Sequence, residues 1–188
     1  MTRNLARLNT LDFIIEECYD SWGNKNLVHE FEQTKVKDEK VINDILPVVE
    51  MLKSINTSNF SKAVIHGDMQ RKHVLFDGEE YCIIDYGCMS YDNKVYEIST
   101  FLAWFCLAED NWNDRDSIHE EVLKEYQVIH SLSDEEIASI KLFTLASYAS
   151  YYLQTSQLIE AGDVSSETAE WNSSAKKLFE LCLEWVGK

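Results

Sequence analysis

The sequence is poor in basic residues. It has 17 lysines and arginines against 33 aspartates and glutamates, and its net charge is −16. Contacts with the phosphates of nucleic acids or anionic membranes need clustered lysine and arginine side chains. A nucleic-acid or membrane partner is therefore disfavoured, and a small cationic ligand fits the charge better. Because net charge also favours solubility, the charge alone leaves both interpretations open.

Long apolar runs and cysteine pairs are missing too. No apolar stretch reaches the roughly 18 residues that a membrane-spanning helix needs, and the polar start MTRNLARLNT has no signal-peptide core. The default expectation is a cytoplasmic protein. The five cysteines are an odd number without Cys-x-x-Cys or zinc-type spacing. This pattern predicts reduced, mostly buried thiols and argues against disulfides or a zinc site.

Proline is almost absent, since Pro47 is the only one, and there is no internal repeat or low-complexity segment. With 45% hydrophobic residues, the chain can bury a core, and we predict a single domain over residues 1–188. Apolar spacing predicts helices over residues 10–22, 38–55, 95–108, 116–129, 134–160 and 167–186, with a loop over 23–37. Inside a helix Pro47 removes a backbone hydrogen bond, which predicts a kink or break near Asp44.

Capping motifs predict where two of these helices begin. Ser133 and Glu136 have the spacing of a capping box, in which each residue bonds to the backbone of the other. Ser165 or Ser166 is suited to cap the last helix, and Gly162 ends the helix before it.

Residues 63–98 carry the most specific pattern in the chain. Short apolar runs at residues 63–65, 74–76 and 81–84 predict strands, and a polar loop at 66–73 lies between the first two. Asp68 lies in this loop and Asp85 follows the third run, so two carboxylates are expected at the ends of neighbouring strands. In phosphoryl transfer one carboxylate orients or deprotonates the attacking hydroxyl, and another holds Mg²⁺ against the phosphates.

Three motifs in this stretch resemble those of the aminoglycoside phosphotransferase and choline kinase superfamily. They are His66-Gly67-Asp68 with His73 five positions after the aspartate, Ile83-Ile84-Asp85-Tyr86-Gly87, and Tyr96-Glu97-Ile98. Their spacing agrees with the family pattern, and the Tyr-Glu form of the third motif is most similar to the hygromycin phosphotransferase branch.

The resemblance implies roles for three of these residues. Asp68 would be the catalytic base, Asp85 the principal magnesium ligand, and His73 stands where the second metal ligand, an asparagine, is usual. Mg²⁺ prefers oxygen ligands to imidazole, so His73 is expected to weaken its binding. The implied cofactors are Mg²⁺ and, as co-substrate, ATP.

The other polar residues of this stretch have two interpretations each. His66 is either a structural brace for the Asp85 region or a catalytic proton shuttle, and bracing is the commoner role of a histidine beside a carboxylate. Arg71 and Lys72 either contact the phosphates of the nucleotide or are solvated loop charges. Glu97 is expected to brace the catalytic loop from the start of a helix.

Two further groups of polar residues have counterparts in related enzymes. Acidic residues after the central helix either line an amine-binding cleft or cap the next helix: Glu109, Asp110, Asp114 and Asp116. A second group resembles the segment that closes over the aminoglycoside in the hygromycin branch: Gln154, Gln157, Glu160 and Asp163.

No nucleotide lobe is recognisable, because neither a Gly-x-Gly-x-x-Gly loop nor a strand with an apolar-flanked lysine precedes His66. We therefore predict an α+β, mostly helical fold: the C-terminal lobe of a kinase-like phosphotransferase, with a small β-hairpin carrying the catalytic loop. The expected function is ATP-dependent phosphorylation of a small amine-bearing acceptor such as an aminoglycoside, with a separate N-terminal lobe as partner. The alternative is a catalytically inactive remnant that binds a small molecule or a protein.

Overall fold

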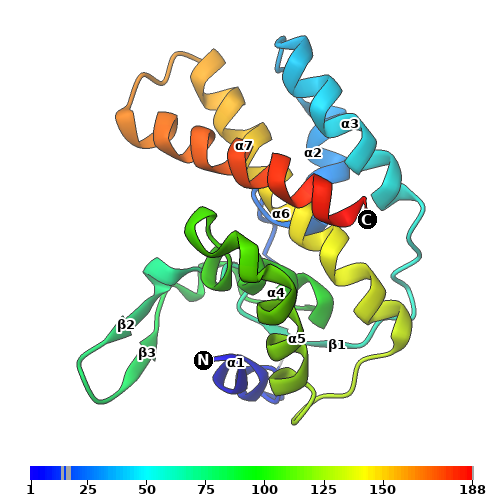
Figure 1. Ribbon diagram of the computed structural model, residues 1–188, viewed down its shortest axis with the longest axis vertical. Helices are drawn as coiled ribbons and strands as arrows, with labels where there is room; N and C mark the ends of the chain where they lie inside the picture. Colours follow the sequence, from blue (N-terminus) through cyan, green and yellow to red (C-terminus); the bar gives the residue numbers. More distant parts are fainter. Residues whose placement is uncertain (14, 16–17, 188) are drawn as a thin grey trace. The chain divides into compact units, whose positions relative to one another are not determined.

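The computed structural model describes residues 1–13, 15 and 18–187, which form two compact units (Figure 1). Unit 1 comprises Met1–Tyr19 and Thr57–Ile140, and unit 2 comprises Asp20–Asn56 and Lys141–Lys188. The described helices are α1 (Thr2–Leu8), α2 (Leu27–Gln33), α3 (Glu39–Lys53), α4 (Lys94–Phe101), α5 (Arg115–Tyr126), α6 (Asp134–Glu160) and α7 (Ser166–Val186). The described strands are β1 (Lys62–Ile65), β2 (Val74–Phe76), β3 (Tyr81–Ile83) and β4 (Ser90–Asn93).

Unit 1 contains two antiparallel strand pairs. β1 pairs with β4, from Lys62 opposite Asn93 to Ile65 opposite Ser90, and α4 packs on β1, whose apolar side chains are buried. β2 and β3 form a hairpin that extends away from the helices of unit 1 (Figure 1). Its side chains are largely exposed, so the hairpin contributes little to the core.

Hydrogen bonds from buried polar side chains connect the elements of unit 1. The Asn9 side-chain amide donates to the Val64 carbonyl oxygen at 2.8 Å, and the Tyr126 hydroxyl donates to Asn9 Oδ1 at 2.7 Å. These bonds link the end of α1 to β1 and α5, and α1 packs on α5. Because both groups are buried, each bond also offsets the cost of removing a polar atom from water.

The capping box at the start of α6 is confirmed. Glu136 Oε2 accepts a hydrogen bond from the Ser133 N–H at 2.7 Å, and Ser133 Oγ accepts one from the Glu136 N–H at 3.2 Å. Glu136 Oε1 also accepts the Ser61 N–H at 2.7 Å. One carboxylate therefore fixes the start of a helix and the entry into β1.

In unit 2, α6 and α7 lie antiparallel. The Tyr152 and Phe179 rings are 5.9 Å apart, and Lys141 Nζ lies 4.5 Å from the Trp185 ring centroid. The middle of α6 is apolar on nearly all sides, which is typical of a central helix. Its buried apolar residues in this unit are Phe143, Leu145, Ala146, Tyr148, Ala149, Tyr152 and Leu153. The predicted bounds of α6 and the cap of α7, where Ser165 accepts the Thr168 N–H, are confirmed.

The helix predicted over residues 10–22 is wrong. The described residues 11–13, 15 and 18–20 are not helical, and positions 14, 16 and 17 lie outside the described residues. Either Thr10 or Asp12 was suited to begin this helix, but the Thr10 N–H and hydroxyl both donate to the Arg7 carbonyl oxygen at the end of α1. A threonine can end a helix as well as begin one, and apolar spacing does not distinguish the two.

The loop predicted over residues 23–37 is also wrong, since it contains α2 and a 3-10 turn at Asn24–Asn26. Packing favours this short helix: Leu27 is fully buried, and the Asn24 amide donates to Ser147 Oγ at 3.0 Å. A helix of this length is marginal without such contacts. Of the kink or break predicted near Asp44, the break is wrong, because α3 continues through Pro47 and buries apolar side chains on both sides of it. The kink stays a prediction.

Two expectations about residues 63–98 need correction. Asp68 and Asp85 follow β1 and β3, which belong to different strand pairs and are not neighbours. Residues 90–93, where the sequence predicts no strand, form β4. Its sequence, Ser-Tyr-Asp-Asn, has no apolar pattern, so pairing with β1 alone defines it as a strand.

The helix expected over residues 95–108 is α4 followed by a π-helical turn, Leu102–Cys106. All five cysteines are free thiols, but only Cys182 is fully buried, and Cys82 is exposed. Within the described parts of the chain, no helix is long and apolar enough to cross a membrane.

Candidate active site

The loop over residues 66–73 connects β1 to β2, and the backbone at its second residue, Gly67, requires a glycine. Gly67 has φ of +84°, and a Cβ atom at this position would collide with the Cys88 carbonyl oxygen. A side chain would therefore be excluded by conformation and by space.

Glu97, in the first turn of α4, accepts two hydrogen bonds from the backbone at the start of this loop. Its Oε1 accepts the His66 N–H at 3.1 Å, and its Oε2 accepts the Gly67 N–H at 2.9 Å. The side chain is completely buried, and this burial raises the pKa of Glu97 to about 7 although the two N–H donors act in the opposite direction. The expected bracing role of Glu97 is confirmed.

His66 is the second buried support of the loop. Its Nε2 donates to the Ile84 carbonyl oxygen at 2.9 Å, and its Nδ1 accepts the Asp68 N–H at 3.3 Å. Burial lowers the pKa of His66, which favours the neutral ring. These contacts link the catalytic loop to the residue before Asp85, as a brace would. Whether His66 also moves a proton stays a prediction.

Asp85 has an unusual backbone conformation. Its φ of 66° and ψ of 59° place it in the left-handed region, where it is the only non-glycine residue among those described. Aspartate tolerates this region better than most residues, at a cost of about 1–2 kcal/mol. The carboxylate is 60% exposed, and its Oδ2 lies 3.3 Å from His73 Nε2.

His73 lies between the two aspartates and is almost completely buried. Its Nδ1 donates to the Asp68 backbone carbonyl oxygen at 2.7 Å and lies 3.6 Å from Asp68 Oδ2. A carbonyl oxygen can only accept, so Nδ1 carries a hydrogen and Nε2 of the neutral ring presents a lone pair to Asp85. His73 Nε2 and Asp85 Oδ2 therefore both offer an electron pair at a separation of 3.3 Å, an arrangement that suits a shared cation.

The donor set at this place fits a divalent cation with two protein ligands, His73 and Asp85. In the described part of the chain, no group of three or more metal-binding side chains is found. Phosphate oxygens of a nucleotide and water would have to complete the coordination shell, as is usual for magnesium sites with one or two carboxylates.

Asp68 is less exposed than Asp85, at 22% of its side chain. Its Oδ1 accepts a hydrogen bond from the Gln70 side-chain amide, and this contact restricts the orientation of the carboxylate. Sequence reasoning did not single out Gln70. A glutamine two positions after an aspartate has no distinctive pattern, so only the structure reveals this contact.

The two basic residues of the loop have different surroundings. Arg71 Nε donates to the Phe105 carbonyl oxygen at 2.6 Å and its Nη2 to that of Cys106 at 3.2 Å, so the guanidinium caps the π-helical turn. Lys72 is exposed. The structure thus brings His66, Asp68, His73 and Asp85 into one cluster within unit 1, while the Arg71 guanidinium contacts backbone after α4.

Residues 5–127 match the sequence model of the phosphotransferase enzyme family. This match covers more than half of the chain and contains the whole cluster. The chain belongs to the phosphotransferase enzyme family. Membership agrees with the predicted superfamily, and the hygromycin branch stays a prediction. No curated protein sequence matches the chain.

Two solved structures resemble this family member over nearly its full length. An amicoumacin kinase in complex with AMP-PNP, Ca²⁺ and Ami has a TM-score of 0.62 and 14% identity, with 97% of this chain and 56% of that chain covered. An ethanolamine kinase from Plasmodium vivax has a TM-score of 0.60 and 11% identity, with 96% and 57% covered.

These likenesses confirm the predicted α+β, mostly helical fold, which corresponds to the C-terminal lobe of a kinase-like phosphotransferase. At such low identity they describe the fold alone. The chain spans 56–57% of the length of the two kinases.

Glu97 should make the stability of the protein depend on pH. Its folded-state pKa of about 7 lies above the ordinary value of 4.5, so its contribution is fully present below pH 4.5 and is lost as the pH rises through 7. We expect the unfolding free energy to fall by up to about 3 kcal/mol over this range. Urea unfolding followed by circular dichroism near pH 5 and near pH 8 measures the change.

The variant Glu97→Gln cannot titrate and should lack this component of the pH dependence. Glu135, an exposed residue next to Glu136, provides a control. The unfolding free energy of Glu135→Gln should depend on pH as strongly as that of the unmodified protein. Equal pH dependence in Glu97→Gln and in the unmodified protein would contradict the assignment.

Proposed function

We propose that the chain is the catalytic and acceptor-binding part of an ATP-dependent small-molecule phosphotransferase. It transfers the γ-phosphate of ATP to a hydroxyl of a small amine-bearing acceptor such as an aminoglycoside. One observation carries the proposal: Asp68, His73 and Asp85 lie together in a chain of the phosphotransferase family, on a loop that Glu97 and His66 hold from the buried side.

Asp68 is the proposed catalytic base. Its partly exposed carboxylate accepts the proton of the acceptor hydroxyl while the hydroxyl oxygen forms a bond to the γ-phosphorus. The bond from that phosphorus to the oxygen bridging the β- and γ-phosphates breaks, and ADP leaves. The hydrogen bond from Gln70 supports this role, because it fixes the direction of the carboxylate.

Asp85 and His73 are the proposed ligands of the divalent cation, which the family implies is Mg²⁺. When bound there, such a cation would offset the negative charge of the phosphates during transfer. The hydrogen bond from Nδ1 to the Asp68 carbonyl oxygen keeps the other nitrogen of His73 turned toward Asp85. This fixed tautomer supports ligation, since metal-bound histidines usually donate their second nitrogen to an oxygen acceptor.

Both loop cations, Arg71 and Lys72, are exposed and are proposed to contact the nucleotide phosphates. Arg71 would first have to release the carbonyl oxygens of Phe105 and Cys106. A lysine acts on phosphate as a mobile point charge and needs no fixed geometry.

A cationic acceptor agrees with the charge of the chain. The net charge of −16 attracts small cations and raises their local concentration. One structural neighbour is named for ethanolamine, which is an amine that carries a hydroxyl group, and this supports the same acceptor class.

The alternative is a catalytically inactive module that binds a small molecule or a protein partner. It is favoured by His73 at the place of the usual second metal ligand, because imidazole suits Mg²⁺ less well than oxygen does. In the active case, a separate N-terminal lobe is the proposed partner. A cytoplasmic location stays part of the proposal.

The role of Asp68 can be tested by kinetics. Asp68→Asn keeps the size of the side chain and removes its basicity, so turnover should fall by about 10²–10⁴-fold while the thermal unfolding midpoint changes little. Formation of ADP and of phosphorylated acceptor is followed with a panel of aminoglycosides and aminoalcohols. Turnover retained in Asp68→Asn, or no transfer by the unmodified protein to any member, would count against the proposal.

The imidazole ligand should change the preference for metal ions. Oxygen ligands suit Mg²⁺, so His73→Asn should lower the Mg²⁺ concentration needed for half-maximal activity by about tenfold. The same substitution should lower the advantage of Mn²⁺, which accepts imidazole more readily. An unchanged metal dependence in His73→Asn would remove His73 from the ligand set.

A further inference from the structure

The β2–β3 hairpin presents apolar side chains to solvent. Leu75, Phe76 and Tyr81 are each more than half exposed, and the hairpin extends away from the helices of unit 1 (Figure 1). Among the described strands β2 and β3 pair only with each other, so each has an outer edge without a paired strand. An exposed apolar edge of this kind is a template for pairing with another chain. A two-stranded hairpin is also marginally stable until further strands extend its sheet.

The hydrogen bonds within the hairpin determine which backbone groups point outward. The Ile84 N–H donates to the His73 carbonyl oxygen at 2.9 Å, so these two residues form a hydrogen-bonded pair. Pairs of an antiparallel ladder alternate, which makes Leu75 and Cys82 the next hydrogen-bonded pair. Phe76 comes directly after Leu75, and its N–H and carbonyl oxygen therefore point to the outer edge of β2.

A two-fold axis at Leu75 joins two copies of β2 along this edge. In this antiparallel register Phe76 of one copy lies opposite Val74 of the other. The Phe76 N–H of each copy can donate to the Val74 carbonyl oxygen of the other, which gives two hydrogen bonds. The Val74 N–H takes no part, because it already donates to the Arg71 carbonyl oxygen. The product is a four-stranded sheet in the order β3, β2, β2, β3.

The side chains on one face of such a sheet match. The Phe76 and Tyr81 rings stack across the hairpin with centroids 4.5 Å apart. Residues opposite each other in antiparallel strands point to the same face, so Val74 of the second copy lies on the other side of Phe76. An aromatic ring beside a β-branched side chain is a favourable cross-strand pair. The pairing therefore covers the exposed side of Phe76 in both copies.

Charge selects β2 over β3 for this pairing. Arg71 and Lys72 precede β2, and the turn after it contains Asp77 and Glu79. Antiparallel copies of β2 bring the basic start of one strand to the acidic turn of the other. Antiparallel copies of β3 would instead bring Glu79 near Asp85, and like charges oppose strand pairing. Because each copy has a net charge of −16, attraction at the edge has to offset repulsion between the copies.

We infer that the outer edge of β2 binds β2 of a second copy of this chain, in a two-fold symmetric dimer. The same surface is used by both copies, as in other symmetric dimers. The strand has only three residues, so the interface is small and the dissociation constant is about 10–100 µM. The inference rests on the hairpin of unit 1 and is independent of the proposed function.

Sedimentation equilibrium over about 1–500 µM protein, in reducing buffer, tests the inference on the full chain. The reducing agent prevents a disulfide through the exposed Cys82. We expect a reversible equilibrium between monomer and dimer. A monomer throughout this range would overturn the inference and leave the hairpin to another partner, such as a separate N-terminal lobe.

A proline variant tests which edge is used. Phe76→Pro removes the outward N–H without removing a hydrogen bond of the hairpin, so the dissociation constant should rise by about tenfold or more. Tyr81→Pro is the matched control and should keep the dimer, because the N–H of Tyr81 points to the outer edge of β3. Both variants lose the stacking of the two rings, so a general weakening of the hairpin affects them alike. Equal dimerisation of the two variants would contradict pairing through β2.

An exchange of charges tests the register. Lys72→Glu and Glu79→Lys should each weaken the dimer by about threefold to tenfold, because each brings like charges together. The double variant keeps the net charge and should restore the affinity of the unmodified protein. Lys72 and Glu79 lie beyond opposite ends of β2, so a contact within one copy does not explain such a rescue. Weakening in the double variant that equals or exceeds that in the single variants would overturn the inference.

Discussion

The candidate site depends on one buried carboxylate. Glu97 accepts the backbone N–H groups of His66 and Gly67, which fixes the start of the loop over residues 66–73 against α4. With these two residues in place, His66 reaches the Ile84 carbonyl oxygen, and the chain positions Asp68 on the exposed side. Burying this carboxylate costs stability, as its raised pKa indicates. Its two hydrogen bonds in turn give the loop a defined backbone.

The second constraint is the pair formed by His73 and Asp85. A hydrogen bond to backbone determines which nitrogen of His73 carries the hydrogen, and a left-handed backbone at Asp85 turns a carboxylate toward the other nitrogen. The left-handed backbone at Asp85 costs stability in the free protein. Strained or mismatched groups of this kind concentrate at functional sites, and here they agree with a place where a cation meets phosphate.

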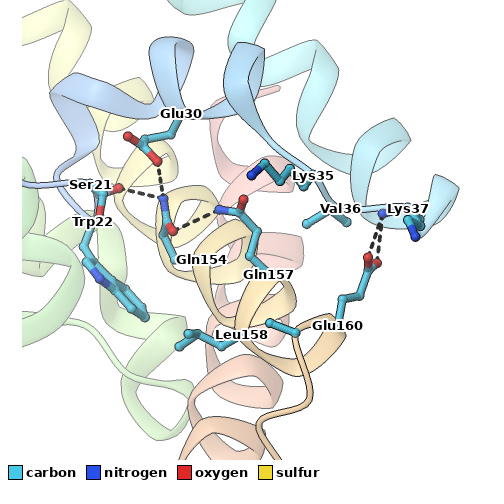
Figure 2. Close-up of a pocket in the computed structure, with 11 residues that line it drawn as sticks. Ser21, Trp22, Glu30, Lys35, Val36, Lys37, Gln154, Gln157, Leu158 and Glu160 are labelled. Atoms are coloured by element: carbon cyan, nitrogen blue, oxygen red, sulfur yellow. Dashed lines mark hydrogen bonds between the residues drawn. The ribbon is translucent and has the colours of Figure 1, made fainter.

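Local signals predicted part of this structure. The capping box of Ser133 and Glu136 depends on two residues that are three positions apart, so the sequence reveals it. The strand β4 and the helix α2 depend on partners far along the chain, and their own residues lack the matching periodicity. The contact between Glu30 and Gln154 (Figure 2) could not be predicted for the same reason, because the two residues are 124 positions apart.

The central claim is that Asp85 belongs to a site for the metal-bound phosphates of a nucleotide. Calorimetric titration of the chain with Mg²⁺-ATP, repeated with Asp85→Asn, tests it most directly. Asparagine tolerates the left-handed backbone at this position, so the substitution removes the charge and leaves the turn intact. The account predicts that the unmodified chain binds Mg²⁺-ATP and that Asp85→Asn loses this binding. No binding by the unmodified chain, or equal binding by both, would contradict it.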